Sequence, residues 1–313
     1  MNLIKYRYLY FGISLLVIIP GVIALIIWGL PLGIDFTGGS LLEVKFASGQ
    51  PPAIAAVTAL YNEMSTAQMD IANPVVQPIG TDSLSIRSKE MNDTLKAQVV
   101  AALKDRFGGG QDVVITNFTQ VSAVIGKEIA IRAAGAVALA SLAILVYITI
   151  AFRKVPNSFR YGTAAIIATI HDILVTLGAE AILGHFLGWQ ADALFLTALL
   201  TIIGFSVHDD IVVFDRIREN SNIYRRVGYE TVVNHSIVQT LDRSINTQLT
   251  VMFTLLALAL FGGVSIRHFV VILLVGVFSG TYSSIFNASP ILVVWENREW
   301  RNWFRRKPGT QIS

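Results

Sequence analysis

The chain contains six apolar stretches, each long enough to cross a membrane as a helix. A helix rises 1.5 Å per residue, so about 20 residues span the roughly 30 Å hydrocarbon core of a bilayer. Charged residues make up 14% of the chain, well below the roughly 25% of an ordinary soluble domain. We therefore predict an α-helical membrane bundle of six transmembrane helices, at residues 8–30, 129–152, 162–184, 193–214, 243–264 and 269–295.

Basic residues in the short loops predict the orientation of this bundle. Lysine and arginine gather after the second, fourth and sixth stretches, whereas the loop at 185–192 has neither. Because cytoplasmic loops are the ones enriched in these residues, we expect both termini in the cytoplasm. Four regions follow: a cytoplasmic N-terminus with the first helix (1–30), an outer domain (31–128), helices two to six (129–295) and a basic cytoplasmic tail (296–313).

The outer segment changes from helical to mixed periodicity. Alternating apolar and polar side chains indicate half-buried strands, and apolar residues three or four apart indicate helices. We expect strands at 40–46, 74–79, 83–88 and 111–118, and helices at 51–64 and after the N-cap residue Asn92. The βαββαβ order predicts a small α+β ferredoxin-like domain between the first two transmembrane helices. It holds no catalytic motif, so we expect a binding, mechanical or passively stabilising role and no enzyme activity.

Two adjacent aspartates, Asp209 and Asp210, lie inside the fourth apolar stretch. One aspartate at the centre of a membrane helix costs roughly 2.5–3.5 kcal/mol on insertion scales, and intramembrane carboxylates usually serve ion or proton movement. We predict that role for Asp209. Asp210 has two interpretations: it belongs to the same site, or it forms an ion pair near the cytoplasmic end of the helix. His208, an imidazole that titrates near neutral pH, would tune or relay the proton.

Arg243 enters the fifth stretch from the side on which the fourth ends, so it is the natural partner of Asp209. An arginine stays charged at any working pH. It would hold the aspartate ionised in one conformation and release it to take a proton in another. The alternative is that Arg243 reaches outward to the lipid headgroups. Nearby, Asn246 and Gln248 offer further hydrogen bonds at the polar start of this stretch.

His171, Asp172 and Glu180 mark a second polar stripe, in the third stretch. Asp172 either joins the proton path or accepts a hydrogen bond that holds neighbouring helices together. In the sixth stretch small residues recur at every fourth position, which lets helices approach closely within the bundle or against a partner. These residues are Gly276, Gly280, Ser284 and Ala288.

Several function classes are excluded by what the sequence lacks. There are no cysteines, so a thiolate metal site and a cysteine nucleophile are impossible. Phosphate loops of the Walker type, HExxH and GxSxG are absent, which argues against ATP hydrolysis and common hydrolase chemistry. The net charge of +3 is small and concentrated at the ends of apolar stretches, a pattern of membrane topology and not of nucleic-acid binding. We expect no cofactor and no metal, and an ion gradient as the energy source.

Four segments in register resemble the SecF subunits of the SecD/SecF family, which belongs to the resistance-nodulation-division superfamily. They are GIDFTGGS at 33–40, HDILVTLGA at 171–179, GFSVHDDIVVFDRIRENS at 204–221 and RSINTQLTV at 243–251. The resemblance covers nearly the whole chain. An outer domain of this modest size favours the F subunit, because SecD subunits carry a far larger one.

The resemblance implies a function and a set of partners. Such a subunit works with a SecD-like subunit in the bacterial inner membrane, with its outer domain in the periplasm. The complex uses the proton gradient to help draw preproteins from the SecYEG translocon. The essential aspartate of the family falls on Asp209 and its arginine on Arg243, whereas His208 and Asp210 depart from the family pattern. Because of this departure sodium is an alternative coupling ion.

Two other functions remain open at this point. A small-molecule or lipid exporter of the same superfamily would need a substrate cavity in the membrane or larger outer domains. A translocon scaffold that transduces no energy would tolerate loss of the charges on Asp209 and Arg243.

Overall fold

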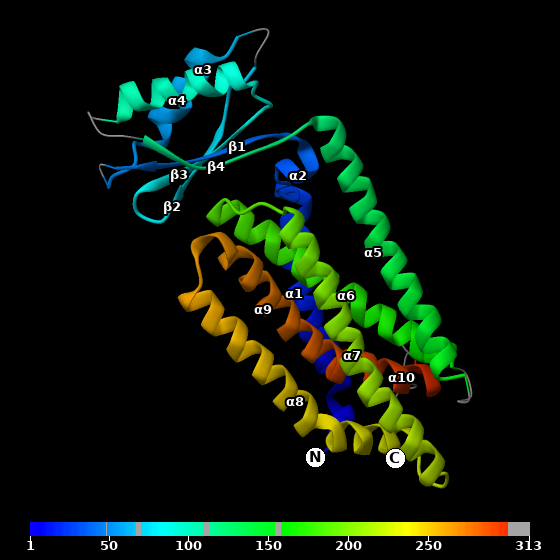
Figure 1. The fold of residues 1–313 in the computed structure, drawn as a ribbon. Coiled ribbons are helices and arrows are strands. Elements are labelled where there is room, and N and C mark those ends of the chain that lie inside the picture. The colour runs from blue at the N-terminus through cyan, green and yellow to red at the C-terminus, as the bar shows by residue number, and fades with distance from the viewer. Residues whose placement is uncertain (48, 67–69, 109–112, 154–157, 300–313) are drawn as a thin grey trace, which may run out of the picture.

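Six long helices form the membrane part of the protein in a computed structural model (Figure 1). The structure describes residues 1–313 except 48, 67–69, 109–112, 154–157 and 300–313. Within the described residues, six helices are long and apolar enough to cross a membrane, which confirms the predicted bundle. Most of the basic tail predicted at 296–313 lies outside the described residues.

The helix bounds differ from the predicted ones mainly in length. The fifth span begins at Tyr229, well before the predicted 243, because a polar segment continues the helix with Val232, Val233 and Ile237 packed inward. The last span is interrupted by a π-helical turn at Ser284–Ala288. The spanning helices are α1 (Arg7–Trp28), α5 (Ala123–Ala151), α6 (Phe159–Leu187), α7 (Ala193–Ile223), α8 (Tyr229–Phe261) and α9 (Val264–Ser283), which α10 (Ser289–Glu296) continues.

Helices α6, α7 and α9 form the centre of the bundle. Between 44% and 56% of the central residues of these three spans are buried, against 6% to 17% for α1, α5 and α8. In Figure 1, α5 and α8 lie on opposite sides of the bundle. The acidic residues of the predicted site are on α6 and α7, so they lie on the most enclosed helices.

Glycines allow the helices around this centre to touch. A Cβ atom added to Gly21 of α1 would lie 2.9 Å from the Cα atom of Gly178 on α6. A Cβ atom on Gly280 of α9 would lie 3.2 Å from the Cβ atom of Ser206 on α7. Contacts this close leave no room for larger side chains. The small-residue face predicted in the last span therefore packs within the bundle.

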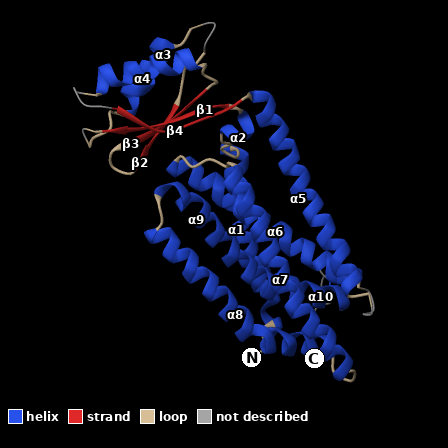
Figure 2. Ribbon diagram, in the orientation of Figure 1, coloured by secondary structure: helices blue, strands red, loops and turns tan. Residues whose placement is uncertain are grey.

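The α+β domain follows α1 and precedes α5. Its strands are β1 (Gly39–Phe46), β2 (Val75–Ile79), β3 (Ser83–Ser88) and β4 (Val113–Val121), and its helices are α2 (Ile34–Thr37), α3 (Ile54–Met64) and α4 (Asp93–Phe107). The sheet order is β2-β3-β1-β4, with every neighbouring pair antiparallel. The predicted ferredoxin-like order is confirmed. Figure 2 shows α3 and α4 on the face of the sheet that is turned away from the bundle.

Local sequence explains these elements. Leu42, Val44 and Phe46 alternate along β1 and are at most 1% exposed, so they form the centre of the domain core. Asn92 caps α4 by accepting a hydrogen bond from the Leu95 N–H group at 2.7 Å. Side-chain caps of this kind satisfy an otherwise unpaired donor at the helix start.

Two glycines join the domain to the bundle. Gly38 and Gly39 have φ angles of +76° and +126°, which other residues rarely adopt. A Cβ atom on Gly38 would lie 2.5 Å from the Cα atom of Ala123, at the start of α5. The entry of the chain into the domain and its return into the membrane are therefore adjacent.

The domain also contacts the loop between α6 and α7. The Gln77 side chain of β2 donates a hydrogen bond to the carbonyl oxygen of Gly188. Asp35 Oδ2 accepts from the N–H group of Ala193, the first residue of α7, at 2.9 Å. Burial lowers the pKa of the Arg87 guanidinium on β3, and the nearby carboxylates, Asp192 foremost, oppose that shift. The domain thus contacts the end of α7 directly.

Candidate functional site

The side chain of Asp172, near the middle of α6, is held by hydroxyl groups from two other helices. Ser206 of α7 donates to it at 2.6 Å, and Ser279 and Ser283 of α9 each donate at 2.7 Å. His171 Nδ1 lies 3.0 Å from the same carboxyl group. Hydrogen bonds to a charged group contribute about 1.5–3 kcal/mol each. Asp172 therefore links α6, α7 and α9 through hydrogen bonds, and its part in the proton path stays a prediction.

Asp209 and Asp210 are both buried but have different surroundings. Asp209 is 2% exposed, and its Oδ2 atom accepts a hydrogen bond from Gln248 Nε2 of α8 at 2.6 Å. Asp210 is fully buried, and neither carboxyl oxygen accepts a hydrogen bond of good geometry among the described residues, although the Ser284 hydroxyl of the last span lies near it. An unpaired buried charge costs several kcal/mol. A proton or a small cation would remove that cost, so the pair has the chemistry of an ion-binding site.

The ion-pair interpretation of Asp210 is wrong. That pairing belongs to the next acid along α7, Asp215, which contacts Arg218 at 2.5 Å and whose side chain is 54% exposed. Asp210 lies more than one turn deeper, on the face of α7 that packs inside the bundle. It is therefore part of the buried acidic site.

The π-helical turn Ser284–Ala288 packs against this part of α7. Ser284 Oγ donates to the carbonyl oxygen of Ser206 at 3.1 Å, and Asn287 Nδ2 donates to Ser14 Oγ of α1 at 2.8 Å. Single π-helical turns frequently occur at functional sites. Here the turn places polar groups of the last span beside the acidic helices.

Arg243 and His208 lie near Asp209 without contacting it. Both are exposed, and no ion pair joins Arg243 to Asp209 in the described part of the chain. Gln248, five residues after Arg243 on α8, donates a hydrogen bond to the Asp209 carboxyl group instead. The partnership of Arg243 with Asp209 and the relay through His208 stay predictions, because this conformation makes neither contact.

A second acidic position lies closer to the α+β domain. Glu180 of α6 is fully buried, and its Oε2 atom lies 2.7 Å from Nε2 of His268 on α9. Thr176 lies between Glu180 and Asp172, and its hydroxyl donates to the carbonyl oxygen of Asp172 at 2.7 Å. The polar stripe predicted on α6 is therefore buried as a unit. His268 was missed, because a single histidine near a helix start carries no sequence signal for such a contact.

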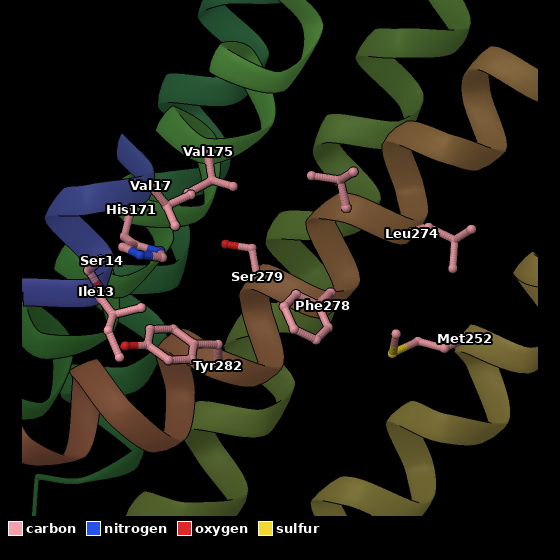
Figure 3. Close-up of a pocket in the computed structure, with 11 residues that line it drawn as sticks. Ile13, Ser14, Val17, His171, Val175, Met252, Leu274, Phe278, Ser279 and Tyr282 are labelled. Carbon is pink, nitrogen blue, oxygen red and sulfur yellow. The ribbon is translucent and has the colours of Figure 1, made fainter. Parts of the chain in front are cut away.

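An apolar cavity of about 410 Å³ lies beside Asp172 (Figure 3). His171 reaches into it, and the Nε2 atom of this ring has no partner among the described residues. A neighbouring cavity of about 250 Å³ includes Gln248 in its lining and shares Met252 with the first. The larger cavity is lined by Ile13, Ser14, Val17, His171, Val175, Met252, Leu274, Val275, Phe278, Ser279 and Tyr282.

The site is one of acids and hydroxyls without a recognisable metal centre. Among the described residues, no group of three or more His, Cys, Asp or Glu side chains could hold a metal ion. The arrangement is a column across the bundle, from Glu180 through Asp172 to Asp210 and Asp209, on helices that also contact the α+β domain. In membrane proteins, buried acids of this kind usually mark a functional site.

Two family models match the chain. The model for the C-terminal part of the protein export membrane proteins SecD/SecF matches residues 100–298, and the model for the SecD/SecF GG motif matches residues 23–49. The first match covers more than half of the chain. The chain belongs to the SecD/SecF family of protein-export membrane proteins.

Individual relatives narrow the likeness to SecF. The chain is 57% identical to the protein translocase subunit SecF of Anaerolinea thermophila over 313 residues, 99% of both chains. It is 50% identical to that of Thermobaculum terrenum, over 98% of this chain and 97% of the other.

Solved structures of SecDF share the fold. The crystal structure of SecDF from Thermus thermophilus, a translocon-associated membrane protein, matches 95% of this chain with a TM-score of 0.81 and 29% identity. SecDF in its super-membrane-facing form matches 96% with a TM-score of 0.63 and 26% identity. This chain spans 39% of the length of each of those SecDF chains.

Proposed function

We propose that this chain is the F subunit of a SecD–SecF accessory complex, which uses the proton gradient to assist late stages of Sec-dependent protein export. The observation that carries the proposal is the set of three buried carboxyl groups of Asp172, Asp209 and Asp210 in the middle of the bundle. Buried intramembrane acids mark ion and proton paths. One charge that crosses about 100 mV yields about 2.3 kcal/mol, so a few protons supply useful work.

The partners and the location follow from the family. The subunit would pair with a SecD-like subunit beside the SecYEG translocon, in the bacterial inner membrane. Both termini would be cytoplasmic, and the α+β domain would lie in the periplasm, where it engages the translocating preprotein. The short basic loops support this orientation.

Helix α7 would carry the coupling. Asp209 and Asp210 are on this helix, and protonation of Asp209 would change its contact with Gln248 of α8. The same helix begins at Ala193, where Asp35 of the α+β domain accepts the first free N–H group. A shift of α7 would therefore reach the domain that handles the preprotein.

Arg243 would compete with Gln248 for Asp209. In this structure the neutral amide of Gln248 holds the carboxyl group at 2.6 Å. A movement of α8 that brings the permanently charged guanidinium to Asp209 would favour the ionised acid and release the proton. The two contacts would then define the proton-bound and proton-free states.

The test is preprotein export into inverted membrane vesicles that carry this chain with its SecD partner. We would compare the wild type with Asp209→Asn, with and without a proton gradient. Asp215→Asn is the matched control, because this acid is on the same helix but exposed. The gradient should speed late export in the wild type and the control, and not in Asp209→Asn.

Two outcomes would overturn the proposal. Equal stimulation of the wild type and of Asp209→Asn would make the acid structural and favour the scaffold interpretation, especially if Arg243→Ala also exports normally. Stimulation by a sodium gradient alone would keep the coupling role of Asp209 and replace the proton by sodium.

A further inference from the structure

Glu180 is a buried acid that the function proposed above does not use. It is fully buried in α6, and its Oε1 atom has no hydrogen-bond partner among the described residues. The other carboxyl oxygen contacts His268 Nε2 at 2.7 Å. An acid that needs only to hold two helices together gains nothing from an unpaired oxygen, which costs free energy in the bundle. The free oxygen is therefore available for a ligand.

His268 connects this acid to the surface. Its side chain is 15% exposed, whereas that of Glu180 is fully covered. The imidazole lies near the start of α9, at the end of the bundle next to the α+β domain, and the Trp189 ring covers it with a centroid distance of 5.0 Å. Histidine is the side chain that gains and loses protons near neutral pH. His268 is therefore the member of the pair that reaches the molecular surface.

Glu180 lies on the same face of α6 as Asp172 of the central site. Asp172, Thr176 and Glu180 are four residues apart on α6 and all three are fully buried. Side chains at this spacing lie on one face of a helix, and eight residues correspond to about 12 Å along its axis. Thr176 lies between the two acids on this face, and its hydroxyl donates to the main-chain carbonyl oxygen of Asp172.

We propose that Glu180 and His268 form a second proton-binding site, which loads the path to Asp172 from the side of the α+β domain. A hydronium ion gives its proton to Nδ1 of His268 and leaves water. The Nε2 proton of the same ring moves to Glu180, so the imidazole stays neutral and the carboxylate becomes a carboxylic acid. The inference rests on the proposed function, because it supplies the protons that Asp209 uses.

Other titratable groups lie at this end of the bundle. None of them forms a hydrogen bond or an ion pair with Glu180 among the described residues. On α1 no residue after Tyr10 is titratable, and on α7 none lies before His208. The groups on the packed helices and the adjoining loop are His185, Arg267, Lys127, Glu128, Arg132 and Asp192. In the α+β domain they are Asp35 and Arg87, which contact or face the α6–α7 loop.

The experiment measures gradient-stimulated export as a function of the pH inside inverted vesicles, where the α+β domain lies. Glu180→Gln keeps the size of the side chain and the contact with His268 but cannot take up a proton. We expect its stimulation to fall about tenfold near neutral internal pH, since relayed proton transfer gains at least this factor. Stimulation should recover at acidic internal pH, where protons reach the path without the relay.

Controls separate this inference from the proposed function. Glu128→Gln removes an exposed acid at the same end and should leave the pH profile unchanged. Asp209→Asn should abolish stimulation at every pH, and if it does not, the proposed function itself fails. Glu180→Asp keeps a carboxyl group and should restore part of the response. A wild-type pH profile in Glu180→Gln, or no recovery in Glu180→Asp, overturns the second proton-binding site.

Discussion

Replacing Gly178 by alanine should weaken the contact between α1 and α6. A Cβ atom at this position would lie 2.6 Å from the Cα atom of Gly21 and 3.1 Å from its carbonyl carbon. Carbon atoms pack best at about 3.5–4.0 Å, so the two helices must separate by about 1 Å. Overpacking of this kind costs about 1–3 kcal/mol, and the better helix propensity of alanine returns at most about 1 kcal/mol. We expect a net loss of up to about 2 kcal/mol once the full propensity gain is subtracted.

The matched control is Gly12→Ala on α1, the helix that Gly178 contacts. A Cβ atom on Gly12 would meet nothing within 4 Å, so only the propensity gain applies and this variant should be as stable as the wild type or more so. Thermal unfolding of the purified chain in lipid nanodiscs measures both variants. Equal unfolding temperatures for Gly178→Ala and Gly12→Ala would refute this prediction. They would show that the close approach of α1 and α6 does not limit the packing of the two helices.

Three further predictions concern the α+β domain and its contact with the bundle. Asp35→Ala removes the acceptor for the Ala193 N–H group and should cost about 0.5–2 kcal/mol of thermal stability. The buried hydroxyl of Tyr61 has no partner among the described residues, so Tyr61→Phe should be neutral or stabilising by about 1 kcal/mol in chemical denaturation. Hydrogen bonds from Arg106 lower the pKa of the exposed Glu63; the wild-type advantage over Glu63→Gln should be complete above about pH 4.3 and disappear as the pH falls through the folded-state pKa.

The elements best predicted from the sequence are those with a strong local pattern. The strand at Ser83–Ser88 has the predicted bounds, because alternation and a glycine turn define it locally. The start of α8 was missed, because residues 229–242 mix polar groups with a few valines and isoleucines and contain no apolar run. Helix α2 is too short for any periodicity to indicate it.

In the candidate site, too, features with a local sequence pattern could be predicted, and contacts between distant helices could not. Asp209, Asp210 and Asp172 could be found because a carboxyl group inside an apolar stretch is costly wherever it points. Gln248 was named only as a general hydrogen-bonding group, and its contact with Asp209 depends on how α7 and α8 pack. The contact between Glu180 and His268 joins α6 and α9, which are far apart in the sequence. No local pattern records such contacts.

The adjacency of Gly38 and Ala123 limits how the α+β domain can move. Both covalent links between the α+β domain and the membrane helices pass through this one place, so the domain is attached at a single edge. Rotation about that edge needs little strain, whereas translation would pull α1 and α5 along with it. The hydrogen bond between Gln77 and Gly188 lies away from this edge and holds the domain against the α6–α7 loop. Any swing of the domain must therefore begin by releasing the loop that leads into α7.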